Sequence, residues 1–101
     1  MYIHVALYKW KPAVSPQEVQ QAFAEITALA PQVTGIIEIS CAENVSQYSE
    51  GYTHVILVRA ETQEAIDAYR AHPAHRSAAH KIELMEQHGI GVDFVTPRPA
   101  K

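Results

Sequence analysis

The fold is decided by residues 52–75, which have the sequence YTHVILVRAETQEAIDAYRAHPAH. Residues 52–60 alternate and are rich in strand formers, which predicts a strand. Thr62 suits the N-cap of a following helix over 63–71. The proline after His72 disfavours helical geometry at that residue, so the helix ends or kinks there and another helix starts. This stretch therefore predicts one strand followed by a pair of helices.

The rest of the chain adds strands and a helix on both sides of this stretch. Ser15 and Glu18 form a capping-box pattern with a proline between them, which predicts a helix start. Gly89 ends the last helical pattern, and an alternating apolar strand follows it. The other expected elements are a strand over 2–10, a helix from 16 to near 31, a strand over 35–45, a loop at 46–51 that joins it to the strand at 52–60, a third helix from 73 to about 88, and a final strand around 90–94.

The order strand, helix, strand, strand, helix pair, strand is typical of the split βαβ pattern of ferredoxin-like α+β domains. We expect a four-stranded antiparallel sheet whose helices all lie on one face, which leaves the other face bare. That face is apolar, and a large exposed apolar patch implies a partner surface. We therefore expect a homodimer that packs sheet against sheet. The apolar residues expected on this face are Ile3, Val5, Leu7, Val55 and Leu57.

Length and composition bound the class of protein. The 101 residues are 48% hydrophobic and 19% charged, which predicts a single domain over 1–101 with its core at about 2–96 and a tail at 97–101. The net charge of −3 argues against a nucleic-acid partner, and no apolar run approaches the roughly 20 residues of a membrane span. The single cysteine, Cys41, excludes an intrachain disulfide and, with no signal-peptide pattern at 1–10, predicts a reducing, cytoplasmic location.

A cluster of polar aromatic side chains lies where the helix pair meets. Tyr69, His72 and His75 are three residues apart, so they share roughly one helical face if the helix only kinks. His75 would lie in the first turn of the third helix, where the helix dipole disfavours an imidazolium and a neutral imidazole can act as a general base. Tyr69 could donate to that imidazole or to a developing oxyanion. The alternative is that both histidines cap a helix break and that Tyr69 is simply a buried side chain.

Two further histidines lie on strands that are adjacent at the centre of the expected sheet. His4 and His54 could line one pocket floor beneath the helices, with His72 helping to orient a substrate. The alternative is a pair of core histidines, each with its own hydrogen-bond partner. The side chains expected beside them in the pocket are Tyr8, Phe23, Ile26 and Ile56.

The sequence predicts no metal site and no cofactor site. His72 and His75 have no cysteine or carboxylate close by in the sequence, which makes a poor zinc ligand set. His80 and His88 are expected at solvated helix positions. The chain has no glycine-rich phosphate loop, no Ser-His-Asp order and no dinucleotide fingerprint. Any catalysis is therefore expected to be cofactor-free acid–base chemistry.

Several segments resemble the stress-responsive A/B barrel domain (Dabb) family over about residues 2–96. The resemblance implies a dimeric α+β barrel. Within the family, the plant polyketide cyclases are the most similar by motif. The segments that carry the resemblance are His4-Val5, Gly51-Tyr52-Thr53-His54, Tyr69 with His72-Pro73-Ala74-His75, Val92-Asp93-Phe94 and Thr96-Pro97-Arg98.

The resemblance also implies roles for individual residues. In those cyclases the histidine matching His75 is the base, the tyrosine matching Tyr69 assists it, and the histidines matching His4 and His54 line the pocket. The expected function is that of a homodimer with a small apolar pocket that acts on a carbonyl or polyketide-like molecule, as an aldol-type cyclase, a lyase or an isomerase. The alternatives are a non-catalytic, stress-associated binding or scaffold protein and a metal-assisted variant.

Overall fold

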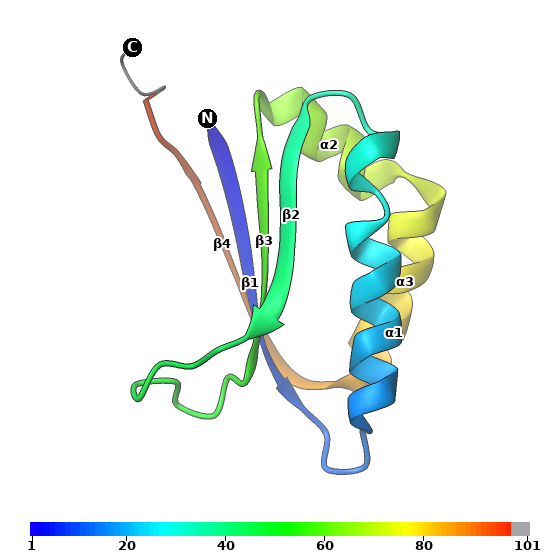
Figure 1. The fold of residues 1–101 in the computed structure, drawn as a ribbon, viewed down its shortest axis with the longest axis vertical. Coiled ribbons are helices and arrows are strands. Elements are labelled where there is room, and N and C mark those ends of the chain that lie inside the picture. The colour runs from blue at the N-terminus through cyan, green and yellow to red at the C-terminus, as the bar shows by residue number, and fades with distance from the viewer. Residues whose placement is uncertain (98–101) are drawn as a thin grey trace.

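Two layers make up the computed structural model, which describes residues 1–97: an antiparallel sheet and a set of helices on one of its faces (Figure 1). The sheet has four strands in the order β2-β3-β1-β4, and every neighbouring pair is antiparallel. This arrangement confirms the predicted ferredoxin-like split βαβ fold. The elements are β1 (Tyr2–Trp10), α1 (Pro16–Thr27), the short 3-10 helix η1 (Ala30–Gln32), β2 (Ile36–Glu43), β3 (His54–Ala60), α2 (Gln63–Ala71), α3 (Pro73–Met85) and β4 (Glu86–Val95).

The predicted helix caps are present. The Ser15 hydroxyl accepts a hydrogen bond from the Glu18 backbone N–H at 3.2 Å, and the Glu18 carboxylate accepts one from the Ser15 N–H at 2.9 Å. Thr62 caps α2 through the N–H of Ala65. His72 is extended, with φ −62° and ψ 134°, so α2 ends there and α3 begins at the next residue. The helix therefore breaks at this point and does not merely kink.

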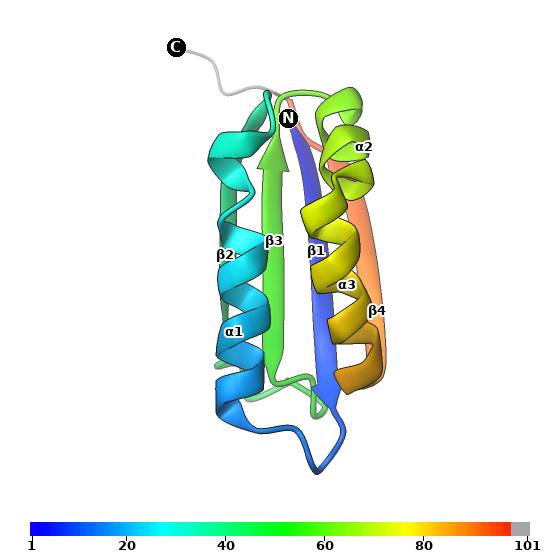
Figure 2. The same ribbon diagram turned by 90° about the vertical axis from the view of Figure 1, so that its right-hand side faces the viewer.

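The core lies between the sheet and the helices. Figure 2 looks onto the helical layer and shows α1 over β2 and β3, and α2 and α3 over β1 and β4. Because side chains alternate along a strand, one set from β1 and β3 faces these helices and becomes buried. The largest fully buried side chains are Tyr69, Ile26, Leu29, Ile66 and Val58.

The opposite face of the sheet carries the predicted apolar residues, and β4 extends the apolar surface. The register pairs Ile3 with Phe94, Val5 with Val92, and Leu7 with Ile90. The three β4 side chains are 38–46% exposed, since no helix of the described chain covers this face. No helix within residues 1–97 is long and apolar enough to cross a membrane.

The main departure from the expected elements is the junction of α3 and β4. The last helix ends at Met85, not near His88, and β4 starts at the next residue without a loop. Pairing of Glu86 with Trp10 and of His88 with Lys9 extends the ladder between β1 and β4, which outweighs the helical tendency of these residues.

His88 therefore lies on a strand and not on a helix, and its Nδ1 is 2.7 Å from the Tyr52 hydroxyl. At the other ends, β2 and β3 are shorter than expected, and α1 stops at Thr27 before the 3-10 helix. The expected tail at 97–101 lies, except for Pro97, outside the described residues.

Candidate functional site

A cavity of about 440 Å³ lies between β1, β4 and the helices α2 and α3. Its size is within the range of small-molecule pockets. It is lined by His4, Ala6 and Tyr8 of β1, Ile26 of α1, Ile56 of β3, Tyr69 and Arg70 of α2, His75, Ala79, Ile82 and Glu83 of α3, and Glu86, Gly89, Ile90 and Gly91 of β4. The sequence-predicted residues that the structure brings together here are His4, Tyr8, Ile26, Ile56, Tyr69 and His75.

Tyr69 and His75 are in direct contact across the break between α2 and α3. Their rings meet edge to face, with centroids 4.4 Å apart. His75 is the third residue of α3, so it lies in the first turn, as expected. Burial lowers the pKa of His75, and the nearby side chains of His4, Arg70 and His72 add to the shift, against a contact with the Arg70 backbone that raises it. The imidazole is therefore held neutral and able to accept a proton.

The phenol of Tyr69 lies beside this imidazole. Its side chain is only 2% exposed, and burial raises its pKa well above the usual range for tyrosine. A phenol that stays protonated can donate a hydrogen bond to an oxyanion that forms in the cavity. The pair thus offers a proton acceptor and a hydrogen-bond donor on adjacent side chains.

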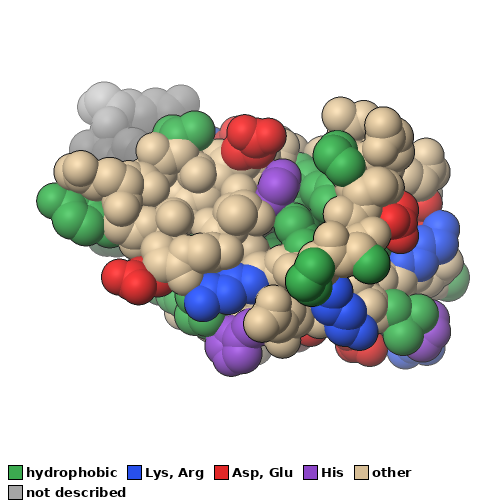
Figure 3. Space-filling view, turned by 90° about the horizontal axis from the view of Figure 1, so that it is seen from below, with side chains coloured by type: hydrophobic (Ala, Val, Ile, Leu, Met, Phe, Trp, Pro, Cys, Tyr) green, Lys and Arg blue, Asp and Glu red, His purple; other side chains and the backbone are tan. Residues whose placement is uncertain are grey.

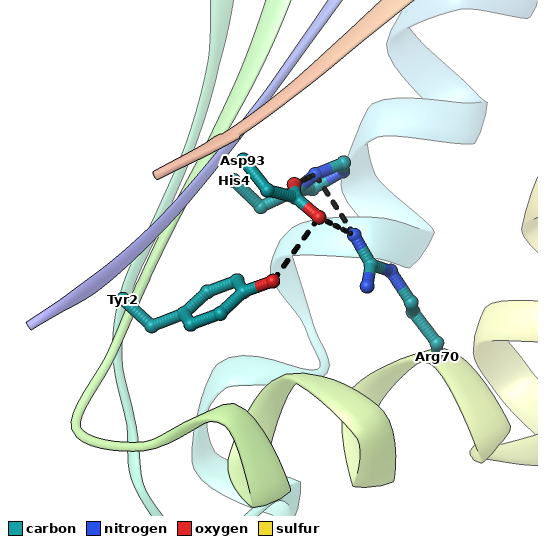
Figure 4. A network of polar contacts seen from close by, with 4 residues as sticks. All are labelled: Tyr2, His4, Arg70 and Asp93. Atoms are coloured by element: carbon teal, nitrogen blue, oxygen red, sulfur yellow. Dashed lines mark hydrogen bonds and ion pairs between the residues drawn. The ribbon is translucent and has the colours of Figure 1, made fainter. Parts of the chain in front are cut away.

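A network of polar contacts joins two residues of the cavity wall, His4 and Arg70, to Asp93 and Tyr2 (Figure 4). The Asp93 carboxylate of β4 lies 2.6 Å from Nδ1 of His4, because the register places these residues opposite each other. Arg70 donates to the same carboxylate at 2.9 Å, and the Tyr2 hydroxyl donates to it at 3.2 Å. Three side chains from two other elements therefore converge on one carboxylate.

The contacts of this network determine where Asp93 and His4 carry protons. Burial raises the pKa of Asp93, but the hydrogen bonds and charges of Arg70 and His4 outweigh that effect, so the pKa is lowered overall. Because Nδ1 of His4 is the nitrogen next to this carboxylate, it carries the proton, and Nε2 is the nitrogen that remains for a ligand. Arg70 also approaches His4 Nδ1 at 3.2 Å; since a guanidinium has donors only, its hydrogen bond goes to Asp93.

The other end of the cavity is acidic. Glu83 of α3 and Glu86 of β4 line it beside the phenol of Tyr8. Burial, with a smaller effect from the Glu86 charge, raises the pKa of Tyr8 to about 12. The cavity is therefore polar at both ends and apolar only between them, which differs from the small apolar pocket that we expected.

His54 and Phe23 lie in a second hollow of about 340 Å³, so the expectation that His54 shares a pocket floor with His4 is wrong. The reason is the register. Tyr8 is opposite His54 and His4 is opposite Val58, which separates the two histidines by about 13 Å along the strands. Figure 3 views the molecule from below and shows hydrophobic and histidine side chains at the surface of this end, among polar side chains and backbone.

Aromatic packing and hydrogen bonds hold His54 in this hollow. Trp10 donates its indole N–H to Nδ1 of His54 at 2.8 Å, and the Thr53 hydroxyl lies 2.9 Å from the same nitrogen. The rings of Trp10 and Phe23 lie 5.7 and 5.8 Å from the imidazole. Burial lowers the pKa of His54, although the Glu43 carboxylate acts in the opposite direction. The alternative of a histidine with its own hydrogen-bond partner describes this residue, although it is half-buried and not part of the core.

His72 is also outside the cavity. Its Nδ1 accepts the backbone N–H of Ala74 at 3.1 Å, so it caps α3. Within residues 1–97, no group of three or more histidine, cysteine or carboxylate side chains could hold a metal ion. The Cys41 thiol is partly buried, and burial raises its pKa to about 12.

Sequence reasoning missed the charged residues of the cavity. Asp93 could have been found by pairing the first and last strands, which puts it opposite His4. Arg70 directly follows Tyr69, but an arginine in the last turn of a helix is ordinarily a solvated C-terminal charge. Glu83 and Glu86 carried no signal, because their place depends on where α3 ends.

Comparison with known proteins agrees with this fold. The family profile described as Stress responsive A/B Barrel Domain (Dabb) matches residues 3–96. The stress-response A/B barrel domain-containing protein HS1 of Arabidopsis thaliana is 31% identical over 74 residues, which cover 71% of this chain and 68% of that protein. Olivetolic acid cyclase of Cannabis sativa is 28% identical over 74 residues, covering 71% and 73% of the two chains.

A solved structure, described as a dimeric ferredoxin-like protein of unknown function from Jannaschia sp. CCS1, superposes with a TM-score of 0.86 at 24% identity. The match covers 94% of this chain and 98% of that one. The profile match over nearly the whole chain and the identity to HS1 show that the chain belongs to the stress-responsive A/B barrel domain (Dabb) family.

Proposed function

We propose that this protein is a cofactor-independent acid–base enzyme that removes a proton next to a carbonyl group of a small molecule. The observation that carries the proposal is the contact between a neutral His75 and a protonated Tyr69 at the wall of a cavity of small-molecule size. The similarity to a protein named olivetolic acid cyclase supports it. The reaction classes that fit are aldol-type cyclisation, lyase chemistry and isomerisation.

The proposed chemistry needs only these two side chains. His75 accepts the proton from the carbon next to the carbonyl, the electron pair of the broken C–H bond forms the C=C bond of an enolate, and the π pair of the carbonyl moves to its oxygen. Tyr69 donates a hydrogen bond to the resulting enolate. In an aldol closure, the enolate carbon attacks a second carbonyl, and the alkoxide that forms takes the proton back from His75. In an isomerisation, His75 returns the same proton to another carbon of the enolate system.

The remaining residues of the cavity position the substrate. His4, held by Asp93, offers Nε2 to it, while Tyr8, Ile26 and Ile56 form walls. The expected substrate-binding roles of His54, Phe23 and His72 are not part of the proposal, because these side chains lie outside the cavity.

We also propose that the functional unit is a homodimer that packs through the bare sheet face. The apolar ladder of β1 and β4 continues across β3, and solved relatives of this fold are described as dimeric. The cavity lies on the helical side, so each protomer keeps its own site. Val5→Asp or Leu57→Lys buries an unpaired charge in such an interface at a cost of several kcal/mol. Light scattering should therefore report a dimer for the wild type and a monomer for either variant; a monomeric wild type contradicts the proposal.

Deuterium incorporation next to a carbonyl tests the catalytic proposal without knowledge of the natural substrate. In D₂O, the protein should accelerate the exchange of deuterium for the hydrogens next to the carbonyl of methyl hexyl ketone. Mass spectrometry measures this exchange. His75→Ala should lower the acceleration by about 100-fold or more, and Tyr69→Phe should lower it less. His80→Ala, an exposed position on the same helix, is the matched control. An equal rate for the wild type and His75→Ala contradicts the assignment.

One observation favours a second candidate, a non-catalytic binding protein. Asp93 pairs with His4, and no carboxylate within residues 1–97 forms a hydrogen bond or ion pair with His75. A carboxylate beside His75 would stabilise its protonated form, so without one the imidazole is a weaker base. Binding of the ketone without any exchange would favour this candidate.

A further inference from the structure

The cavity has opposite charge character at its two ends. His4 of β1 and His75 of α3 mark one end together with Arg70, and Tyr8 and Glu83 lie further along the same two elements. Four residues of strand and eight residues of helix each span about 12–13 Å, and β1 and α3 lie side by side in Figure 2. The cavity is therefore a trough about 12–13 Å long between β1 and α3, with Arg70 at its basic end and Glu83 at its acidic end.

At the basic end, Arg70 keeps hydrogen-bonding capacity for a ligand. Within residues 1–97, its guanidinium forms hydrogen bonds through one terminal nitrogen only, to Asp93 and next to His4. The Asp93 carboxylate also receives donors from His4 and Tyr2. The side chain of Arg70 is 39% exposed, and the planar fork of its remaining N–H groups matches a carboxylate.

At the acidic end, two carboxylates are without a basic partner. Neither Glu83 nor Glu86 forms an ion pair with any other side chain of the described chain. The carboxylate of Glu86 lies over Gly89, where an added Cβ would approach it to 2.5 Å. A Cβ on Gly91 would meet nothing within 4 Å, so the floor between the two ends is open.

We propose that the cavity takes an elongated oxo acid, with its carboxylate at Arg70 and an amino or hydroxyl group at Glu83 and Glu86. The assignment of an oxo group rests on the proposed function, because His75 can remove a proton only from a carbon next to a carbonyl. The two charged ends follow from the cavity alone. A carboxylate at Arg70 pairs with the free N–H groups, and a donor at the far end pairs with the uncompensated carboxylates.

Four linear probes of similar length separate these requirements: ω-aminooctanoate, octanoate, octylamine and octanedioate. Their dissociation constants with the full-length protein can be measured by NMR titration. A charge-assisted hydrogen bond corresponds to about tenfold in affinity or more. ω-Aminooctanoate should therefore bind at least about tenfold more tightly than octanoate or octylamine, and octanedioate should bind more weakly than octanoate. Octanedioate binding as tightly as ω-aminooctanoate overturns the proposal.

Variants test which residue binds the ligand at each end of the cavity. Arg70→Met should weaken octanoate about tenfold and leave octylamine unchanged, whereas Glu86→Gln should weaken octylamine and leave octanoate unchanged. Arg70→Lys keeps the charge without the planar fork, and should retain part of the octanoate affinity. Arg76→Met and Glu64→Gln remove the same charges from exposed positions and serve as controls. Equal losses of octanoate affinity in Arg70→Met and Arg76→Met overturn the assignment of the basic end.

The same samples distinguish this proposal from the proposed function. If the probe affinities follow the expected order and methyl hexyl ketone shows no catalysed exchange, the ligand class stands and the acid–base enzyme does not. If the ketone exchanges but the four probes bind equally, the enzyme stands and the charged-end ligand class is overturned.

Discussion

The His75 cavity and the His54 hollow place the same residue type in two different environments. Both regions lie between the sheet and the helices, with volumes of about 440 and 340 Å³. His75 touches one aromatic ring and faces an open cavity. His54 lies among the rings of Trp10 and Phe23, and its Nδ1 is occupied by Trp10 and Thr53.

The difference lies in what each imidazole has left to offer. Because Nδ1 of His54 accepts hydrogen bonds, the proton of the neutral ring is on Nε2, and this ring is a donor on its free side. Burial lowers the pKa of both histidines, so a lowered pKa does not by itself identify a base. The cavity, its charged neighbours and the adjacent Tyr69 distinguish His75.

The largest expected effect comes from removing each imidazole in turn. His75→Ala should lower the exchange activity by about 100-fold or more. His54→Ala should leave that activity within a few-fold, because its side chain lies in the other hollow, against Trp10 and Phe23. Deuterium exchange and urea unfolding of both variants provide the comparison. An equally severe loss of activity in a folded His54→Ala variant would contradict the separation of the two regions.

Filling the cavity should produce the next largest effect. Gly91→Val adds a side chain above an open floor, on the helical face opposite Ala6. A β-branched residue also suits a strand, so the free energy of unfolding should not fall. The affinity for ω-aminooctanoate should fall about tenfold or more, as measured by NMR titration. Retained affinity would show that the probe binds elsewhere.

The His54 hollow should respond through stability and not through activity. Trp10→Phe keeps an aromatic ring and removes the indole N–H that His54 accepts at 2.8 Å. The loss of one hydrogen bond should lower the free energy of unfolding by about 1 kcal/mol. Urea denaturation measures this change, and the exchange activity should stay unchanged. A loss of activity without a loss of stability would instead link the hollow to the site.

The sequence was sufficient for the fold, because caps, alternation and element order agree with one another. The capping box at Ser15 and Glu18 and the break at His72 are local features that depend on few neighbours. Placing His4 and His54 required the register, and register depends on pairing between distant strands. A shift of four residues moves a histidine from one cavity to another.

The polar ends of the cavity were harder to foresee for the same reason. Asp93 reaches His4 only through the pairing of the first and last strands. Glu86 faces the cavity because α3 ends at Met85, whereas the helical pattern continues further. Element boundaries are the least reliable part of sequence-based reasoning, and here a boundary determines the chemistry.

The smallest expected effect concerns pH, and it tests the coupling of Arg70 to His75. The pKa of His75 is lowered from its ordinary value of 6.5 in the folded protein, so its basic form persists below pH 6.5. Activity should therefore fall only when the pH drops below this lowered pKa. The Arg70 charge contributes to that lowering. Arg70→Met should therefore move the acidic limb of the activity profile to higher pH, whereas Arg76→Met should not.

The same shifts predict a direction for stability. For His75 and His54, the unfolded chain binds protons more readily than the folded protein, so stability is complete above the unfolded pKa and is lost as the pH falls through the folded one. His54→Gln should reduce the loss of stability on acidification without moving the activity profile, because its imidazole lies in the other hollow. Chemical denaturation across this pH range and the exchange profile together determine which histidine controls which property. A single variant that moved both would show that the two regions titrate as one.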